Sequence, residues 1–212
     1  MSNKSRYRFE QMQPTAVIRG IALFEGFISR EEQAELVAQI RMLAKAAPLF
    51  SPQTPYGRPM SVRMTSAGQV GWFSDRNGYR YAERHPEGAA WPAIPKPVLA
   101  IWRALVSEMR EPDCCLVNYY GEGARMGMHQ DRDEADFDWP VLSISLGDDA
   151  LFRIGNNQRG GTTQSFWLRS GDVLVMGGAA RLIHHGIDRI AFGSSPLLPN
   201  GGRINLTLRV AL

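Results

Sequence analysis

The tripeptide His129-Gln130-Asp131 combines an imidazole with a carboxylate, two groups that serve proteins as metal ligands. In a strand, the side chains at positions i and i+2 point to the same face, so these two groups would project together. Two further histidines, His184 and His185, follow in a later segment. Two histidines and one carboxylate with open coordination positions form the facial triad of non-haem Fe(II) oxygenases. A polar surface turn would explain the same residues without a metal, and spacing alone does not choose between the two later histidines.

The segment 203–209 alternates strictly between polar and apolar side chains. Its polar face carries two arginines, an asparagine and a threonine: Arg203, Asn205, Thr207 and Arg209. A strand at a solvated edge would show the same pattern. If this face points inward, its two guanidinium groups require an anionic partner, because buried charges without partners are strongly destabilising. Guanidinium groups bind carboxylates in a bidentate manner, so this wall beside an iron site would suit the dicarboxylate 2-oxoglutarate.

Aromatic and cationic side chains are interleaved between residues 72 and 84. They are Trp72, Arg76, Tyr79, Arg80, Tyr81 and Arg84. Aromatic faces beside cations favour the stacking of single-stranded or flipped bases. The glycines at positions 68, 71 and 78 would allow the movement that admits a base. A hydrophobic turn over the core is the alternative interpretation.

The elements that must position these residues change in character along the chain. The first twenty residues are predicted to be extended. Ser29 and Glu32 form a capping box for a helix that ends near residue 47, and a second helix is predicted over about 98–109. Short strands separated by turn residues follow at Cys114–Tyr120, Met126–Asp131, Val141–Leu146, Leu151–Ile154, Ser165–Leu168, Asp172–Met176 and Arg203–Val210. This spacing predicts a mainly β, α+β fold built on an antiparallel sandwich or barrel, with the helices on one face.

The composition is that of a globular protein of 212 residues with 44% hydrophobic and 21% charged residues. The net charge of +3 combines a basic half up to Arg110 with an acidic remainder, a pattern that suits contact with a polyanion. No run reaches the length of a membrane span, and the N-terminus does not resemble a secretory signal. Cys114 and Cys115 are adjacent, which indicates buried strand residues in a reducing cytoplasm rather than a disulfide framework.

Together the motifs resemble the AlkB family of iron- and 2-oxoglutarate-dependent nucleic-acid demethylases. The likeness runs from about Pro14 to Val210 and rests on Gly71-Trp72, Gly78–Tyr81, Asn118–Tyr120, His129–Glu134, Gly171–Val173, Arg181–Ile187 and Arg203–Arg209. The resemblance implies a double-stranded β-helix (jelly-roll) core over about 112–212 with supporting N-terminal helices. It also implies an N-terminal extension and nucleotide-recognition lid over about 14–90, and a single dioxygenase domain over 1–212.

The resemblance also implies roles for individual residues. The iron ligands would be His129, Asp131 and His185, since the family places its second histidine directly before Gly-Ile. The distal carboxylate of 2-oxoglutarate would be held by Arg203 with Asn205 and Tyr120, and Asn118 and Arg209 would lie near the end that chelates iron. The nucleotide would be gripped by Trp72, Tyr79 and Tyr81, and Asp133 would bind the exocyclic amine of the flipped base. His184 stands where the family usually has a tyrosine or a similar residue, and Met176 replaces a tryptophan seen in a close relative within the family.

The implied activity is oxidative demethylation of N-alkylated bases such as 1-methyladenine and 3-methylcytosine in DNA, a direct reversal of alkylation damage. It would require Fe(II), 2-oxoglutarate and O2, and would release succinate and formaldehyde. RNA as a second substrate, the preferred strandedness and the range of adducts stay open, and we expect a cytoplasmic monomer without membrane contact. Two alternatives are an oxygenase that acts on a protein or small molecule, and a non-catalytic cupin-like binding module.

Overall fold

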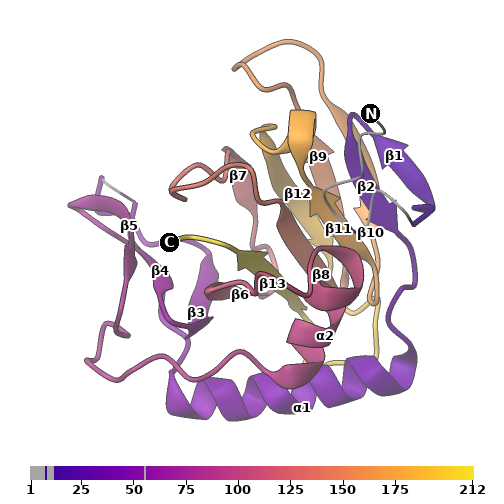
Figure 1. The fold of residues 1–212 in the computed structure, drawn as a ribbon. Helices are drawn as coiled ribbons and strands as arrows, with labels where there is room; N and C mark the ends of the chain where they lie inside the picture. The colour runs from indigo at the N-terminus through magenta and orange to yellow at the C-terminus, as the bar shows by residue number, and fades with distance from the viewer. Residues whose placement is uncertain (1–7, 9–11, 55) are drawn as a thin grey trace.

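Two antiparallel β-sheets and two helices make up the fold in the computed structural model, which describes residues 8, 12–54 and 56–212 (Figure 1). The larger sheet has seven strands in the order β1-β2-β11-β8-β13-β6-β3, and the smaller has four in the order β10-β9-β12-β7. β4 and β5 form a separate hairpin beyond β3. The predicted jelly-roll core is confirmed.

The strands are short, as the spacing of turn residues predicts. The larger sheet contains β1 (Ala16–Ile18), β2 (Ile21–Phe24), β3 (Val62–Gly68), β6 (Cys114–Tyr120), β8 (Val141–Gly147), β11 (Val173–Met176) and β13 (Arg203–Arg209). The smaller sheet contains β7 (Met126–His129), β9 (Asp149–Ile154), β10 (Gln164–Leu168) and β12 (His185–Ala191). The hairpin pairs β4 (Gly71–Asp75) with β5 (Gly78–Ala82).

The two helices pack on the outer face of the larger sheet (Figure 1). α1 (Arg30–Ala46) begins with the predicted capping box, because Ser29 Oγ accepts from the Glu32 N–H and the Glu32 carboxylate accepts from the Ser29 N–H. α2 (Lys96–Leu105) ends four residues before the predicted boundary. The chain turns there because Ser107 Oγ accepts from the Met109 N–H, which offers the backbone an alternative to the helix. Neither helix in the described part of the chain is long and apolar enough to cross a membrane.

β13 lies in the middle of the larger sheet, between β8 and β6, so the solvated-edge interpretation is wrong. Its apolar side chains join the core beneath the helices, together with Val117 of β6 and Trp102 of α2. Its polar side chains therefore point into the space between the two sheets, where a second apolar cluster forms around Phe152 and Leu174. The alternation of this one strand thus separates a dry core from a polar chamber.

Other local features also differ from what the sequence predicts. β7 ends at His129, two residues before the predicted end, and Asp131 lies in the loop that follows because its carbonyl accepts from the Arg181 guanidinium instead of joining the sheet. β12 was not predicted, because its pairing contains register shifts that obscure alternation. Within the predicted extended arm, Ala16–Ile18 forms β1, whereas residues 1–7 and 9–11 lie outside the described residues.

Candidate metal centre and cofactor pocket

A cavity of about 910 Å³ lies between the two sheets and extends to the β4–β5 hairpin. Eleven of the twelve site residues predicted from the sequence line it: Trp72, Tyr79, Asn118, Tyr120, His129, Asp131, Asp133, His185, Arg203, Asn205 and Arg209. The exception is Tyr81, which does not line the cavity and whose hydroxyl donates to the buried carboxylate of Glu134. The volume lies within the range of pockets that enclose small organic ligands, about 300–1,000 Å³.

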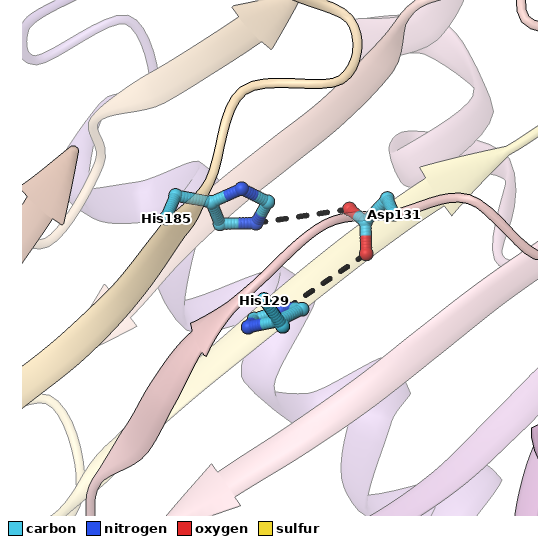
Figure 2. Close-up of side chains that lie close together, drawn as sticks. All are labelled: His129, Asp131 and His185. Carbon is cyan, nitrogen blue, oxygen red and sulfur yellow. Dashed lines mark ion pairs between the residues drawn. The ribbon is translucent and has the colours of Figure 1, made fainter. Parts of the chain in front are cut away.

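Two strands of the smaller sheet and one loop bring His129, Asp131 and His185 together (Figure 2). His129 ends β7 and pairs directly with His185, the first residue of β12. Their Nε2 atoms each lie 3.8 Å from a carboxylate oxygen of Asp131. One potential ligand atom from each residue lies within 4.8 Å of the others. The three groups are close enough together that they could hold one metal ion.

Hydrogen bonds orient the imidazoles of His129 and His185 so that the Nε2 lone pair of each ring is free to bind a metal ion. His129 Nδ1 lies 2.9 Å from the Gly127 carbonyl, and His185 Nδ1 lies 3.0 Å from the Ile183 carbonyl. Because a carbonyl oxygen only accepts, each Nδ1 carries the proton and each Nε2 is available as a ligand. Asp131 Oδ2 is buried and has no hydrogen-bond partner in the described structure. Two imidazole nitrogens and one carboxylate oxygen fit the facial triad of Fe(II).

The charges at this centre favour the metal-binding protonation states. Burial alone would raise the pKa of Asp131, but Arg209, at 2.7 Å from Oδ1, and the two imidazoles lower it to about 2. Burial, with a smaller effect of His129, lowers the pKa of His185 to about 4. At neutral pH the carboxylate is therefore ionised and the imidazole of His185 is neutral, as metal ligation requires.

Arg203 provides a second, separate anchor in the same cavity. Its side chain is almost completely buried, with 1% of the residue exposed, and it makes no ion pair with any carboxylate of the described residues. Nη2 donates to Ser145 Oγ at 2.8 Å, whereas Nε and Nη1 have no partner in the described structure. Burial lowers its pKa to about 10. A buried guanidinium with two unused donor atoms fits a carboxylate such as the distal group of 2-oxoglutarate.

Two asparagines line the cavity between these anchors. Asn205 Nδ2 donates to Ser143 Oγ at 2.7 Å and to the Ile144 carbonyl at 3.1 Å, which holds the amide in one orientation. Asn118 Nδ2 lies 3.4 Å from Asn205 Oδ1, and Asn118 Oδ1 is buried without a partner in the described structure. Tyr120 adds a buried phenol on the same strand as Asn118. These groups offer polar contacts along the length of a bound dicarboxylate.

The β4–β5 hairpin presents an aromatic surface to the cavity. Trp72 stacks on Tyr79, with ring centroids 5.5 Å apart and an interplanar angle of 20°. Trp72 Nε1 donates to Asp133 Oδ2 at 2.9 Å. Tyr81, two residues further along β5 and on the same face, instead donates to Glu134 Oε1 at 2.5 Å. The hairpin is thus joined to the loop that carries the metal ligand Asp131.

Glu134 and Arg181 lie within motifs that carry the family resemblance, but the sequence assigns neither of them a role. Glu134 is buried and accepts from Arg181 Nη2 at 3.0 Å, and its other oxygen lies 3.3 Å from Arg209 Nε. Arg181 also donates to the carbonyl of Asp131 at 2.6 Å. Glu134 follows three other charged residues, so local sequence favours a solvated turn and contains no sign of its burial.

The cavity is also lined by His184 and Met176, the two positions at which the resemblance implies a departure from the family. His184 is half-buried, and its Nδ1 donates to the Asn156 carbonyl at 2.8 Å. Met176, at the end of β11, is buried in the apolar cluster between the sheets. Both residues therefore contribute to the shape of the cavity wall.

Comparison with known proteins agrees with this geometry. Residues 20–209 match the sequence profile of the 2OG-Fe(II) oxygenase superfamily. The chain is 52% identical over 200 residues to an alpha-ketoglutarate-dependent dioxygenase AlkB homolog of Caulobacter vibrioides, which covers 94% of this chain and 91% of the relative. It is 30% identical to the DNA N(6)-methyladenine demethylase ALKBH1D of Arabidopsis thaliana, with 91% and 50% covered. The solved structure of OsALKBH1 is similar with a TM-score of 0.78 and 30% identity, over 93% of this chain and 99% of that one.

Proposed function

The chain belongs to the AlkB dioxygenases of the 2OG-Fe(II) oxygenase superfamily, and we propose that it oxidatively demethylates N-alkylated bases in nucleic acid. It is an Fe(II)- and 2-oxoglutarate-dependent dioxygenase that uses O2. The observation that carries the proposed substrate is the single cavity that contains the metal triad, Arg203 and the Trp72–Tyr79 stack. The relative named as a DNA demethylase supports the same class of substrate.

Different side chains would bind the metal ion and 2-oxoglutarate at this centre. His129 and His185 would hold iron through Nε2, and Asp131 would hold it through Oδ2. Arg203 would bind the distal carboxylate of 2-oxoglutarate. Arg209 contacts the metal ligand Asp131, and Asn118 would lie near the end of 2-oxoglutarate that chelates iron. Bound iron supplies the oxidation of the N-alkyl carbon, coupled to decarboxylation of 2-oxoglutarate to succinate. Arg209 keeps the carboxylate of Asp131 ionised and oriented by its bond to Oδ1.

Base recognition depends on the hairpin and on Asp133. The stacked rings of Trp72 and Tyr79 offer a face for a flipped base, and stacking contributes about 1–3 kcal/mol per base. Asp133 accepts from Trp72 through Oδ2, which leaves its other oxygen for an exocyclic amine. Methylation at a pairing nitrogen of adenine or cytosine makes the ring cationic, so a carboxylate beside an aromatic face favours 1-methyladenine and 3-methylcytosine.

The N-terminal segment and the jelly roll work as one unit in this proposal. Two hydrogen bonds, Trp72 to Asp133 and Tyr81 to Glu134, connect the lid region at about 14–90 with the core at about 112–212. Closure of the hairpin over a bound base would exclude water from the reacting carbon. We propose a cytoplasmic monomer, and the two buried free cysteines support a reducing compartment.

Formaldehyde release from methylated oligonucleotides tests the proposal. Matched DNA and RNA substrates, single- and double-stranded, would carry 1-methyladenine or 3-methylcytosine, with the unmethylated strand as control. We expect release that requires both Fe(II) and 2-oxoglutarate and is abolished in His185→Ala. Turnover of 2-oxoglutarate without formaldehyde from any of these substrates would refute the nucleic-acid assignment and favour a protein or small-molecule substrate. No turnover at all would leave the cupin-like binding module.

A further inference from the structure

Arg19 occupies a backbone position that disfavours arginine. It and Gly20 form the two-residue turn between β1 and β2, with φ angles of 50° and 84°. Turns with positive φ at both central residues favour Asn-Gly or Asp-Gly, because most side chains clash with the backbone there. Arg19 is the one non-glycine residue with positive φ in the described part of the chain. Strain of this kind persists where the side chain makes contacts that the fold or function requires.

The guanidinium of Arg19 binds both ends of the loop between β9 and β10, residues 155–163. Nη1 donates to the Gly155 carbonyl at 2.9 Å and to Asn156 Oδ1 at 2.8 Å. Nη2 donates to Thr162 Oγ1 at 3.0 Å. The β1–β2 turn thus holds together two points of the chain that are separated by the whole loop, which is the long connection above β9 in Figure 1.

This loop forms part of the cavity wall. Its residues Asn157, Gln158 and Arg159 line the same cavity as the metal triad. The inner part is fixed by Gln130, which lies between two metal ligands and whose amide donates to the Asn157 carbonyl at 3.0 Å. Asn157 Nδ2 in turn donates to the Ala179 carbonyl at 2.9 Å. For Gln158 and Arg159, no side-chain hydrogen bond or ion pair is found within the described structure, so their position depends on the loop.

We propose that Arg19 is a positioning residue of the substrate site, which holds the β9–β10 loop so that Gln158 and Arg159 stay in place beside the bound strand. The inference rests on the proposed function, because a nucleic-acid strand supplies the phosphate that the Arg159 cation would meet. Arg19 touches neither the cavity nor the metal ligands, so it acts only through the loop. Its effect is that of preorganisation: an ordered loop loses less conformational entropy when the substrate binds.

The variant Arg19→Asn tests this role with little risk to the fold. Asparagine suits the positive φ of the turn but is too short to reach the loop. We expect the KM for a methylated oligonucleotide to rise roughly 5- to 20-fold, as for the loss of two or three net hydrogen bonds. The kcat, the KM for 2-oxoglutarate and the turnover of 2-oxoglutarate without nucleic acid should stay within about twofold. The Tm should change little, because relief of the backbone strain offsets the lost hydrogen bonds. Arg19→Lys should restore part of the affinity.

Two further measurements separate positioning from general stability. In Arg159→Ala, adding Arg19→Asn should raise the KM little further, because both changes remove the same contact. Backbone amides of residues 157–161 should exchange faster with solvent in Arg19→Asn. Unchanged exchange with an unchanged KM would overturn the inference, and so would a fall in Tm with an equal loss of every activity. If the wild-type enzyme demethylated no oligonucleotide, the proposed function would fail instead, and the exchange experiment would still test the loop.

Discussion

Replacing Arg203 by methionine should stabilise the ligand-free protein while it abolishes binding of 2-oxoglutarate. The guanidinium is buried without a carboxylate partner among the described residues, and burial lowers its pKa to about 10. The difference from an ordinary guanidinium corresponds to a destabilisation of about 3 kcal/mol. Methionine has a similar shape and no charge, but it leaves Ser145 Oγ without its donor, at about 1 kcal/mol. The free energy of unfolding should therefore rise by about 2 kcal/mol.

The same substitution removes the anchor for the distal carboxylate. Truncating one partner of a buried charge pair weakens binding by about 2–5 kcal/mol, so the Kd for 2-oxoglutarate should rise at least about 30-fold. Urea denaturation in the absence of metal and ligand measures the first effect. Calorimetry with 2-oxoglutarate and Mn(II) under anaerobic conditions measures the second. Arg41→Met, at an exposed position on α1, is the matched control and should change neither quantity.

The two effects must have opposite signs. A clear loss of stability in Arg203→Met would mean that Arg203 stabilises the ligand-free fold, and the argument from its missing partner would be wrong. Unchanged affinity for 2-oxoglutarate would show that the dicarboxylate binds elsewhere in the cavity. Either result would refute the reasoning that a buried, unpaired cation marks the site of an anion.

Three further predictions concern the charges around the triad. Glu134→Gln should lower the free energy of unfolding by about 3–5 kcal/mol in urea denaturation, because it leaves buried Arg181 without its anionic partner. Asp133→Ala should lose the preference for 1-methyladenine and 3-methylcytosine in competition assays yet retain turnover of 2-oxoglutarate without nucleic acid; equal loss of both would contradict a role in base recognition. In metal-free protein, the lowered pKa of His185, about 4, means that the unfolded chain binds the proton first on acidification. Stability should therefore fall by up to about 3 kcal/mol between pH 6.5 and pH 4, and His185→Gln should reduce this loss.

Patterns that depend on local geometry were predictable from the sequence. The capping box of α1 is satisfied by two hydrogen bonds between neighbouring residues, and its sequence therefore specifies the start of the helix. The alternation of Arg203–Arg209 follows from the pleat of a strand, whatever surrounds it. The convergence of distant motifs was accessible only through the family resemblance. Spacing alone left both His184 and His185 as candidates, whereas the structure brings only the latter to the triad.

Burial could not be predicted in the charged run after β7. Arg132 and Asp133 are exposed, whereas Asp131 and Glu134 are buried. The difference arises from Arg181 and Arg209, which approach from segments far along the chain and neutralise the two buried carboxylates. Without these cations, burial would be unfavourable and the run would be the solvated turn that its composition suggests.

Arg19 could not be predicted as a functional residue from the sequence, because its partners also come from a distant segment of the chain. In the sequence, the Arg-Gly pair at this tight turn gives no sign of a function for the arginine. Asparagine before the glycine would suit the backbone better. The backbone conformation and the partners of the guanidinium become apparent only when the loop at 155–163 folds back on the β1–β2 hairpin. A residue that is locally unfavourable and makes three long-range hydrogen bonds is the kind of conflict that marks functional positions in otherwise self-consistent folds.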